Sequence, residues 1–183
     1  MVSLLWGIVV VRSKKMIEYT QKFNKGFDFI INNEGGYVND KNDNGGATKY
    51  GISQRSYPHV NIKNLTIEDA KKIYYCDYWL KGKIEQIPDE KVAIKVFDFS
   101  VNLGIRASVI VLQRALRSVG MKVQEDGLMG PQTISATVSS EAPILLTALK
   151  SEAAGYYRII VAKNPSQQKF LNGWLNRAYS QIN

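Results

Sequence analysis

The sequence predicts a mainly α-helical protein with one long polar loop near its front. Apolar residues recur at helical spacing through most of the 183-residue chain, and glycines, asparagines and aspartates gather between residues 35 and 51. No linker rich in proline or serine divides the chain. We therefore expect any two lobes to pack closely against each other.

The first expected helix covers about residues 18–34 and ends where Gly35-Gly36 supplies permissive backbone. Four apolar side chains recur along it at helical spacing: Phe23, Phe27, Ile30 and Ile31. Glu34 lies four residues after Ile30, so its side chain projects from the apolar face. That is an unusual place for a carboxylate.

A polar loop is expected next, over residues 35–51, with a possible short hairpin around Asn44-Gly45-Gly46. After a short segment near residues 53–57, Thr66 and Asp69 have the spacing of a capping box and predict a helix through about Leu80.

Five further helices are expected. The first, over residues 91–103, follows Pro88-Asp89, is too apolar to be exposed, and ends at Gly104. Pro131 suits the first position of a later helix. The other expected ranges are 108–119, 131–138, 143–161 and 166–182.

The composition limits the kinds of partner and site. A formal charge of +8 favours a polyanionic partner, either nucleic acid or a bacterial envelope, although it also fits a solvated basic surface. The sequence shows no helix-turn-helix or RNA-binding signature, so we expect no nucleic-acid partner. With one cysteine and one histidine, no intrachain disulfide or structural zinc site is expected. Cys76 is expected to be a buried core thiol, and no metal or cofactor is expected.

The segment from Glu34 to Ile52 carries the most specific chemistry. A carboxyl group set against apolar neighbours keeps its proton more readily, so Glu34 could act as a general acid. Asp40 and Asp43, in a hydrated loop, would stay ionised. Two carboxyl groups with separated pKa values are what cleavage of a glycosidic bond requires. The alternative is that Glu34 only caps or salt-bridges a helix end and that the aspartates form turns.

The same segment resembles glycoside hydrolase family 108. The likeness covers about residues 27–103 and includes Glu-Gly-Gly-Tyr at residues 34–37 and Gly-Gly-x-Thr-x-x-Gly-Ile at residues 45–52. The resemblance implies a muramidase on a lysozyme-like helical fold with a polar active-site loop or short hairpin. It also implies that Glu34 is the catalytic acid.

The segment is also similar to phage-type lysozymes, which place an aspartate and then a threonine after the catalytic glutamate. Asp43 has the matching spacing, whereas Thr48 lies one residue closer than in that pattern, and Asp40 competes for the role of second carboxylate. The expected catalytic residues are Glu34, Asp43 and Thr48. The expected substrate-binding residues are Tyr37, Asn39, Asp40 and Tyr50. Tyr78 and Trp79 could also stack on sugars, but helical spacing favours a place in the core.

A second resemblance lies downstream, over about residues 104–182. Asn102-Leu103-Gly104, Leu112–Leu116 and the run from Asp126 to Thr133 resemble a small peptidoglycan-binding domain. The Asp-Gly-x-x-Gly-Pro-x-Thr part has a structural cause, since its glycines suit a turn and Pro131 suits a helix start. It therefore predicts a loop shape more than a set of ligand contacts.

These observations predict a tail at residues 1–15, a catalytic lobe at residues 16–103, and a closely packed, peptidoglycan-binding-like helical lobe at residues 104–183. The expected activity is that of an N-acetylmuramidase, either a phage endolysin or a secretion-associated enzyme. The alternatives are a lytic transglycosylase and a non-catalytic wall-binding protein.

We expect the protein to be a monomer whose partner is peptidoglycan. The apolar stretch Leu4–Val11 is too short to span a bilayer, so no stable membrane insertion is expected, and no cleavable signal peptide is recognisable. We expect a protein made in the cytoplasm that acts at the cell wall or periplasm through a separate export route.

Overall fold

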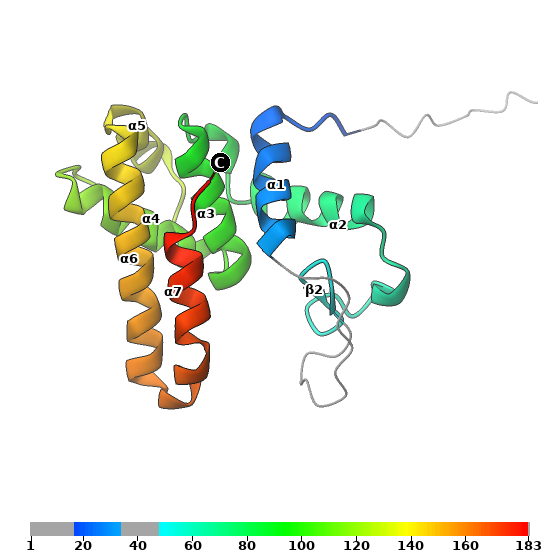
Figure 1. The fold of residues 1–183 in the computed structure, drawn as a ribbon. Coiled ribbons are helices and arrows are strands. Elements are labelled where there is room, and N and C mark those ends of the chain that lie inside the picture. Colours follow the sequence, from blue (N-terminus) through cyan, green and yellow to red (C-terminus); the bar gives the residue numbers. More distant parts are fainter. Residues whose placement is uncertain (1–16, 34–47, 183) are drawn as a thin grey trace, which may run out of the picture.

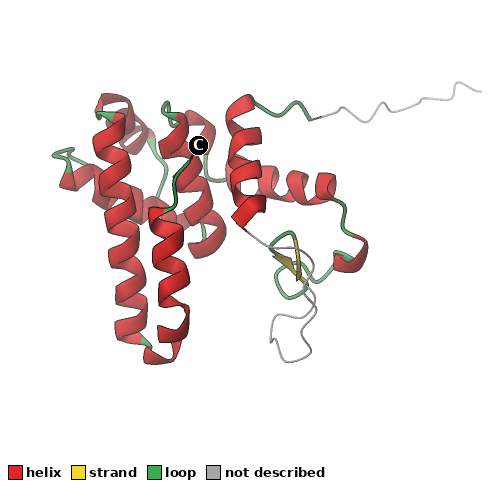
Figure 2. Cartoon of the chain, viewed as in Figure 1, coloured by secondary structure: helices red, strands yellow, loops and turns green. Residues whose placement is uncertain are grey.

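The computed structural model describes residues 17–33 and 48–182, and these form the mainly α-helical fold that the sequence predicts (Figures 1 and 2). The helices are α1 (Gln21–Asn33), α2 (Ile67–Tyr74), α3 (Glu90–Leu103), α4 (Ile105–Ser118), α5 (Pro131–Ser139), α6 (Ala142–Lys163) and α7 (Leu171–Tyr179). Two short strands, β1 (Thr48–Lys49) and β2 (Ile52–Ser53), form a small antiparallel sheet. Shorter helical segments occupy Ile62–Asn64, Tyr75–Leu80, Ile84–Gln86 and Pro165–Phe170.

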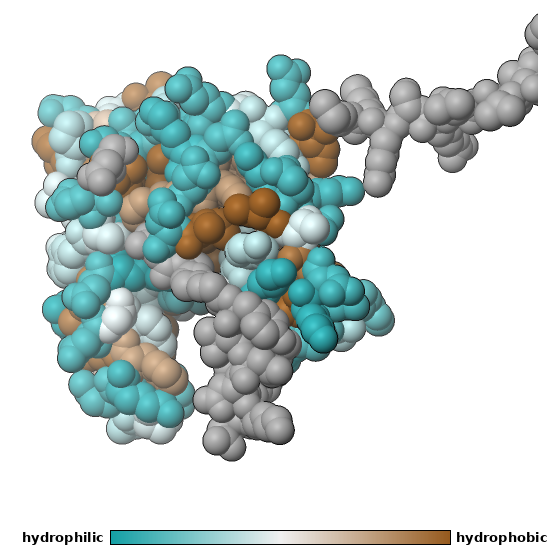
Figure 3. Space-filling model, turned by 45° about the vertical axis from the view of Figure 1, so that its right-hand side comes forward, coloured by the Kyte–Doolittle hydropathy of each residue, from teal (hydrophilic) through white to brown (hydrophobic). Residues whose placement is uncertain are grey.

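Helix α3 is the centre of the fold. It contacts α1 on one side and α4 and α6 on the other, and α6 in turn packs against α7 (Figure 1). One cluster of buried apolar side chains runs from Phe23 of α1 through Phe97 of α3 to Tyr157 of α6. Because both halves of the chain share this core, the expected close packing of the C-terminal lobe is confirmed. Hydrophilic residues cover much of the face seen in Figure 3, and apolar residues gather there in patches.

Local capping signals set most helix ends. Thr66 and Asp69 form the predicted capping box of α2, and the Asp89 side chain caps α3. Gly104 ends α3 with a φ of 85°. The first helix begins at Gln21 and not at residue 18, because the Thr20 hydroxyl accepts a hydrogen bond from the Phe23 amide at 3.2 Å.

Helix α4 and the last predicted helix also differ from the structure in extent. Helix α4 begins directly after Gly104, three residues before the expected start at residue 108. The helix expected at residues 166–182 is divided into a 3₁₀ segment, Pro165–Phe170, and α7, which ends at Tyr179. Apolar spacing over so few residues does not distinguish these helix types or fix their ends.

Cys76 is a further difference, because its side chain is half-buried and not fully buried. It lies in the π-helical segment Tyr75–Leu80 that continues α2. In this segment Trp79 is fully buried, and its indole nitrogen donates to Glu85 at 2.8 Å. The wider π turn places Trp79 in the core and leaves Cys76 at its margin.

Charged side chains are also buried in α3. Lys95 and Asp98 are both 0% exposed, and Lys95 Nζ lies 3.4 Å from Asp98 Oδ2. Lys95 Nζ donates to the Arg177 carbonyl oxygen at 2.6 Å and to Ser180 Oγ at 2.9 Å. Arg177 Nη1 in turn lies 3.5 Å from Asp98 Oδ1. This network joins the end of α7 to α3.

The ionisation of Lys95 should report this burial. Burial lowers the pKa of Lys95 from 10.5 to about 8, although nearby Asp98 acts in the opposite direction. We expect the Lys95 side-chain carbon signal in NMR to titrate near pH 8, with Lys95→Met identifying the signal.

This pKa has a defined effect on stability. Between pH 8 and 10.5 the unfolded chain binds more protons at Lys95 than the folded chain does. The Lys95 contribution to the free energy of unfolding should therefore rise with pH through this window, and be lost as pH falls through 8. A titration midpoint at the ordinary lysine value would contradict the buried position.

Within the described residues, no helix is both long and apolar enough to cross a membrane. The predicted tail, with Leu4–Val11, lies outside those residues.

Candidate functional site

Most of the predicted catalytic segment lies outside the described residues. This applies to Glu34, Tyr37, Asn39, Asp40 and Asp43, and to the hairpin expected around residues 44–46. The structure does describe the two ends of the segment. Helix α1 ends at Asn33, the residue before Glu34, and β1 begins at Thr48. The assignments of these five residues remain predictions.

Thr48 and Tyr50 lie on a tight β-hairpin. Thr48 pairs with Ser53 and Lys49 pairs with Ile52, so Tyr50-Gly51 is a two-residue turn. Both turn residues have left-handed φ angles, 53° and 74°, as a type I′ turn requires. Tyr74 donates from its hydroxyl to the Tyr50 carbonyl oxygen at 2.8 Å, which anchors the turn to the core. The sequence leading out of the predicted catalytic loop therefore enters a fixed element.

The structure describes the surroundings of Thr48, a predicted catalytic residue, and of Tyr50, a predicted substrate-binding residue. Thr48 is half-buried at the start of β1, where it borders the predicted loop. The Tyr50 ring packs against the hydrophobic core, and Lys49 Nζ lies 5.4 Å from its centroid. These contacts give Tyr50 a structural task, and its predicted stacking on a sugar stays a prediction.

The segment after the hairpin is held by polar contacts. Gln54 Nε2 donates to the carbonyl oxygens of Tyr57, Pro58 and Val60 at 3.0–3.2 Å. The Tyr57 hydroxyl donates to Asp77 Oδ2 at 3.1 Å. Burial raises the pKa of Tyr57, which keeps the phenol protonated as a donor. The hairpin and the helical segment containing Asp77 are thereby fixed relative to each other.

Removing the Tyr74 hydroxyl tests this anchor. Tyr74→Phe should lower the free energy of unfolding by about 1 kcal/mol, the usual net value of one hydrogen bond. It should also speed amide hydrogen exchange at Ile52, because the Tyr50 carbonyl loses its contact. Tyr75→Phe is the matched control, since Tyr75 contacts Tyr19 and Phe23 through its ring. Equal protection in both variants would show that the hydroxyl does not hold the turn.

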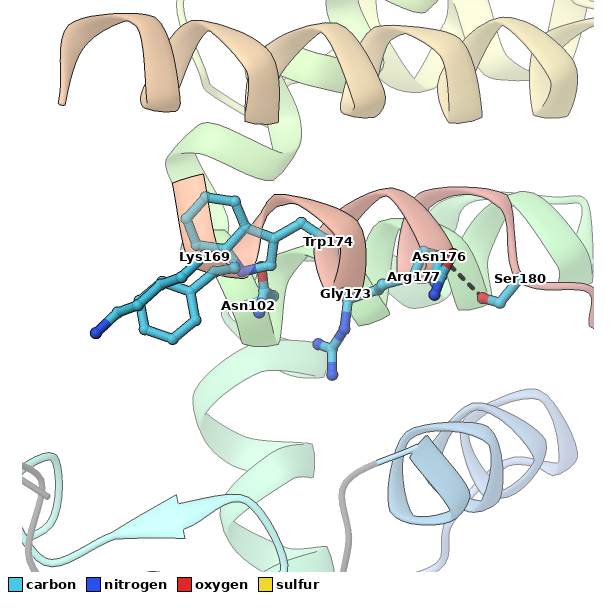
Figure 4. A pocket seen from close by; sticks show the side chains of 8 residues that line it. Asn102, Lys169, Gly173, Trp174, Asn176, Arg177 and Ser180 are labelled. Carbon is cyan, nitrogen blue, oxygen red and sulfur yellow. Dashed lines mark hydrogen bonds between the residues drawn. The ribbon is translucent and has the colours of Figure 1, made fainter. Parts of the chain in front are cut away.

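A pocket of about 610 Å³ lies between α7 and the C-terminal end of α3. In Figure 4 the Arg177 side chain extends from α7 towards the side of the molecule on which the β-hairpin and α1 lie. Asn102 enters it from α3, and its Oδ1 accepts from the Tyr157 hydroxyl at 2.9 Å. Lys169, Phe170, Trp174 and Arg177 also line the pocket.

The sequence analysis did not single out these residues of the 3₁₀ segment and α7. Phe170, Gly173, Trp174 and Arg177 recur at intervals of three and four residues, which places them on one helical face. The mixture of aromatic, cationic and glycine residues on that face is the signal that could have identified a binding surface.

The downstream motif, from Asp126 to Thr133, forms a loop that hydrogen bonds to Gln113 hold together. Gln113 Nε2 donates to Asp126 Oδ1 at 2.8 Å and to Thr133 Oγ1 at 3.1 Å, and Gln113 Oε1 accepts from the Gly127 amide at 2.9 Å. The hydrogen bond from the Leu128 amide, followed by that from Gln113, lowers the pKa of Asp126. Gly127 has a φ of 73°, and Pro131 begins α5. The motif therefore has the structural cause that the sequence indicates.

Among the described residues, no group of His, Cys, Asp and Glu side chains could hold a metal ion.

The comparisons agree with both resemblances. Residues 27–104 match the family model of glycosyl hydrolase 108, and residues 107–179 match that of a predicted peptidoglycan domain. The structure of Brucella abortus SagA is similar, with 26% identity and a TM-score of 0.71 over 85% of this chain and 88% of that chain. No curated protein matches the chain. The two family matches meet near Gly104, where α3 passes into α4.

Proposed function

We propose that this chain, a glycoside hydrolase that acts on peptidoglycan, is an N-acetylmuramidase. It hydrolyses the β-1,4 bond between N-acetylmuramic acid and N-acetylglucosamine. The observation that carries the proposal is the match of residues 27–104 to glycosyl hydrolase 108, since this range contains the whole segment from Glu34 to Ile52. In this proposal residues 16–103 form the catalytic lobe and residues 104–183 the wall-binding lobe.

The proposed mechanism uses two carboxyl groups in different states. Glu34 gives its proton to the leaving glycosidic oxygen as positive charge develops on the sugar. Asp43, or Asp40, stabilises that charge or orients the attacking water. Thr48, on β1, is the third proposed catalytic residue. The glycan is contacted by Tyr37, Asn39, Asp40 and Tyr50. The anchored hairpin supports this arrangement, because a fixed frame reduces the ordering that substrate binding requires.

Mass analysis of wall fragments tests the reaction. Purified sacculi are digested with the full chain, and the soluble fragments are reduced with borohydride before analysis. Hydrolysis predicts reducing N-acetylmuramic acid ends that gain two hydrogens on reduction. Anhydro-muramyl ends would instead show a lytic transglycosylase, which uses no water. Binding to sacculi without release of soluble fragments would show a wall-binding module. Either of these two results would overturn the proposal.

The proposed setting is the bacterial wall. The monomer is made in the cytoplasm and reaches peptidoglycan at the wall or in the periplasm, as a phage endolysin or as a muramidase that opens the wall for secretion. The high positive charge supports this setting, because the wall is rich in carboxylates.

A further inference from the structure

The pocket on α7 has an aromatic wall that reaches from the core to the surface. The Trp174 ring lies next to Tyr157, at a centroid distance of 5.3 Å, and next to Phe170, at 5.8 Å. Tyr157 is fully buried, whereas Phe170, at the other end of this row of rings, is 45% exposed. The buried end therefore fixes an aromatic surface that a ligand can reach.

Two asparagine side chains supply hydrogen-bonding groups to the same pocket. The Tyr157 hydroxyl donates to Asn102 Oδ1 at 2.9 Å, so the Asn102 amide nitrogen is the group that can donate to a ligand. Because the Tyr157 ring also stacks on Trp174, one buried residue positions both Asn102 and the indole in the pocket shown in Figure 4. Asn176 is exposed on α7 and offers a second amide.

Gly173 leaves room beside these groups. It lies inside α7, where glycine is less favourable than alanine. Close packing does not explain the glycine, because a Cβ atom added there would meet nothing within 4 Å. A longer side chain at this position would extend into the space beside Phe170 and Trp174.

The lining suits an uncharged polar ligand with an apolar face. Arg177 pairs with the buried Asp98 at 3.5 Å and Lys169 is exposed to solvent, so charge is not the main feature that the pocket offers. Among the described residues that line it there is no Leu, Ile, Val or Met, unlike the apolar grooves that bind protein helices. Its volume of about 610 Å³ is in the range that small ligands occupy.

We propose that this pocket binds an N-acetylglucosamine ring of the peptidoglycan strand. The C–H groups on one face of the sugar ring pack on the electron-rich face of an aromatic ring, here the exposed Phe170 beside Trp174. The acetamido group has one N–H donor and one carbonyl acceptor, which match the amides of Asn102 and Asn176. The Lys169 ammonium, 4.9 Å from the Phe170 centroid, can move aside, because an exposed cation–π contact is weak.

This inference rests on the proposed function and deepens it, because it names a part of the substrate and where that part binds. The match to the predicted peptidoglycan domain, residues 107–179, contains Phe170, Gly173 and Trp174. The described residues that line the pocket lie outside the proposed catalytic segment, residues 34–52. The pocket would therefore hold the strand without taking part in bond cleavage.

Titration of the full chain with N,N′-diacetylchitobiose, a disaccharide of N-acetylglucosamine, tests the inference. We expect the NMR signals of the Trp174 indole N–H and the Gly173 amide to shift to saturation. Cellobiose, which has hydroxyls in place of the acetamido groups, should bind about fivefold more weakly, as the loss of one hydrogen bond would give. Neither sugar contains muramic acid, so the titrations do not depend on Glu34.

Two variants locate the site. Phe170→Ala removes the exposed ring, and Gly173→Met fills the pocket with a good helix former. Each should weaken binding of diacetylchitobiose by about tenfold or more, a size typical of one stacking contact on an aromatic side chain. The indole N–H signal of Trp79, which is fully buried, should stay in place and show that each variant is folded.

Each variant has a matched control. Tyr179→Ala removes a ring of α7 that is 48% exposed and does not line the pocket. Gly155→Met adds the same side chain within α6, where an added Cβ also meets nothing within 4 Å. Both controls should bind diacetylchitobiose like the parent.

Several results would overturn the inference. These are no saturable shift at Trp174, equal affinity for the two sugars, and parental affinity in either pocket variant. Tighter binding of oligothymidylate with the same Trp174 shift would also overturn it, because the rings would then be a platform for nucleic-acid bases. Failure of the muramidase proposal appears in the fragment analysis, and failure of the sugar site appears in these titrations.

Discussion

Glu34→Gln should reduce wall-lytic activity by about 10²- to 10⁴-fold, the contribution of a positioned general acid. Glutamine has nearly the shape of glutamate and preserves hydrogen bonding, but it cannot give a proton to the glycosidic oxygen. The decrease in turbidity of a sacculus suspension measures the rate. Circular dichroism and the unfolding midpoint should match the parent, because the change removes a reactive proton and no apolar contact.

Asp28→Asn is the matched control for this prediction. Asp28 is an exposed carboxylate on α1, six residues before Glu34 in the sequence. Its substitution should leave lysis near the parental rate. Should Glu34→Gln clear the suspension as fast as Asp28→Asn, Glu34 is not the acid, and the catalytic assignment built on it is wrong.

Asp98→Ala should lower the free energy of unfolding by about 3–5 kcal/mol, the loss that follows removal of one member of a buried ion pair. Asp98 is fully buried between Lys95 Nζ at 3.4 Å and Arg177 Nη1 at 3.5 Å. Without the carboxylate, two cations repel each other in a poorly hydrated space between α3 and α7. Urea unfolding followed by circular dichroism measures the change.

An exposed ion pair between α3 and α1 provides the comparison. Glu90 pairs with Lys25 at 2.7 Å, but the two side chains are 38% and 48% exposed. Glu90→Ala should therefore cost less than about 1 kcal/mol. If Asp98→Ala costs no more than Glu90→Ala, the buried network does not join α7 to α3 in the way described.

Local signals gave most of the secondary structure. The Thr66–Asp69 capping box, the Asp89 cap, the stop at Gly104 and the start at Pro131 each depend on hydrogen bonds or φ angles within a few residues. The same dependence on neighbouring residues explains the errors in the predicted helix ends. The first helix begins later than predicted because Thr20 caps it. The last predicted helix is divided by a 3₁₀ segment whose apolar spacing resembles that of an α-helix.

For the candidate site, the sequence alone predicts Glu34, Tyr37, Asn39, Asp40 and Asp43. Carboxyl groups, glycines and aromatic residues at matching spacings form a pattern that does not need coordinates to be read. The structure adds the frame around that pattern, with α1 ending at Asn33 and the hairpin fixed by Tyr74.

Sequence by itself thus determined the helical class, most helix boundaries and the segment that carries the proposed chemistry, because these follow from neighbouring residues. Only the tertiary structure decided that Lys95 and Asp98 are buried, and that residues of α7 form a pocket with Asn102. The reason is distance along the chain. Lys95 meets Ser180 across 85 residues, and a contact of that range leaves no periodic trace in either segment.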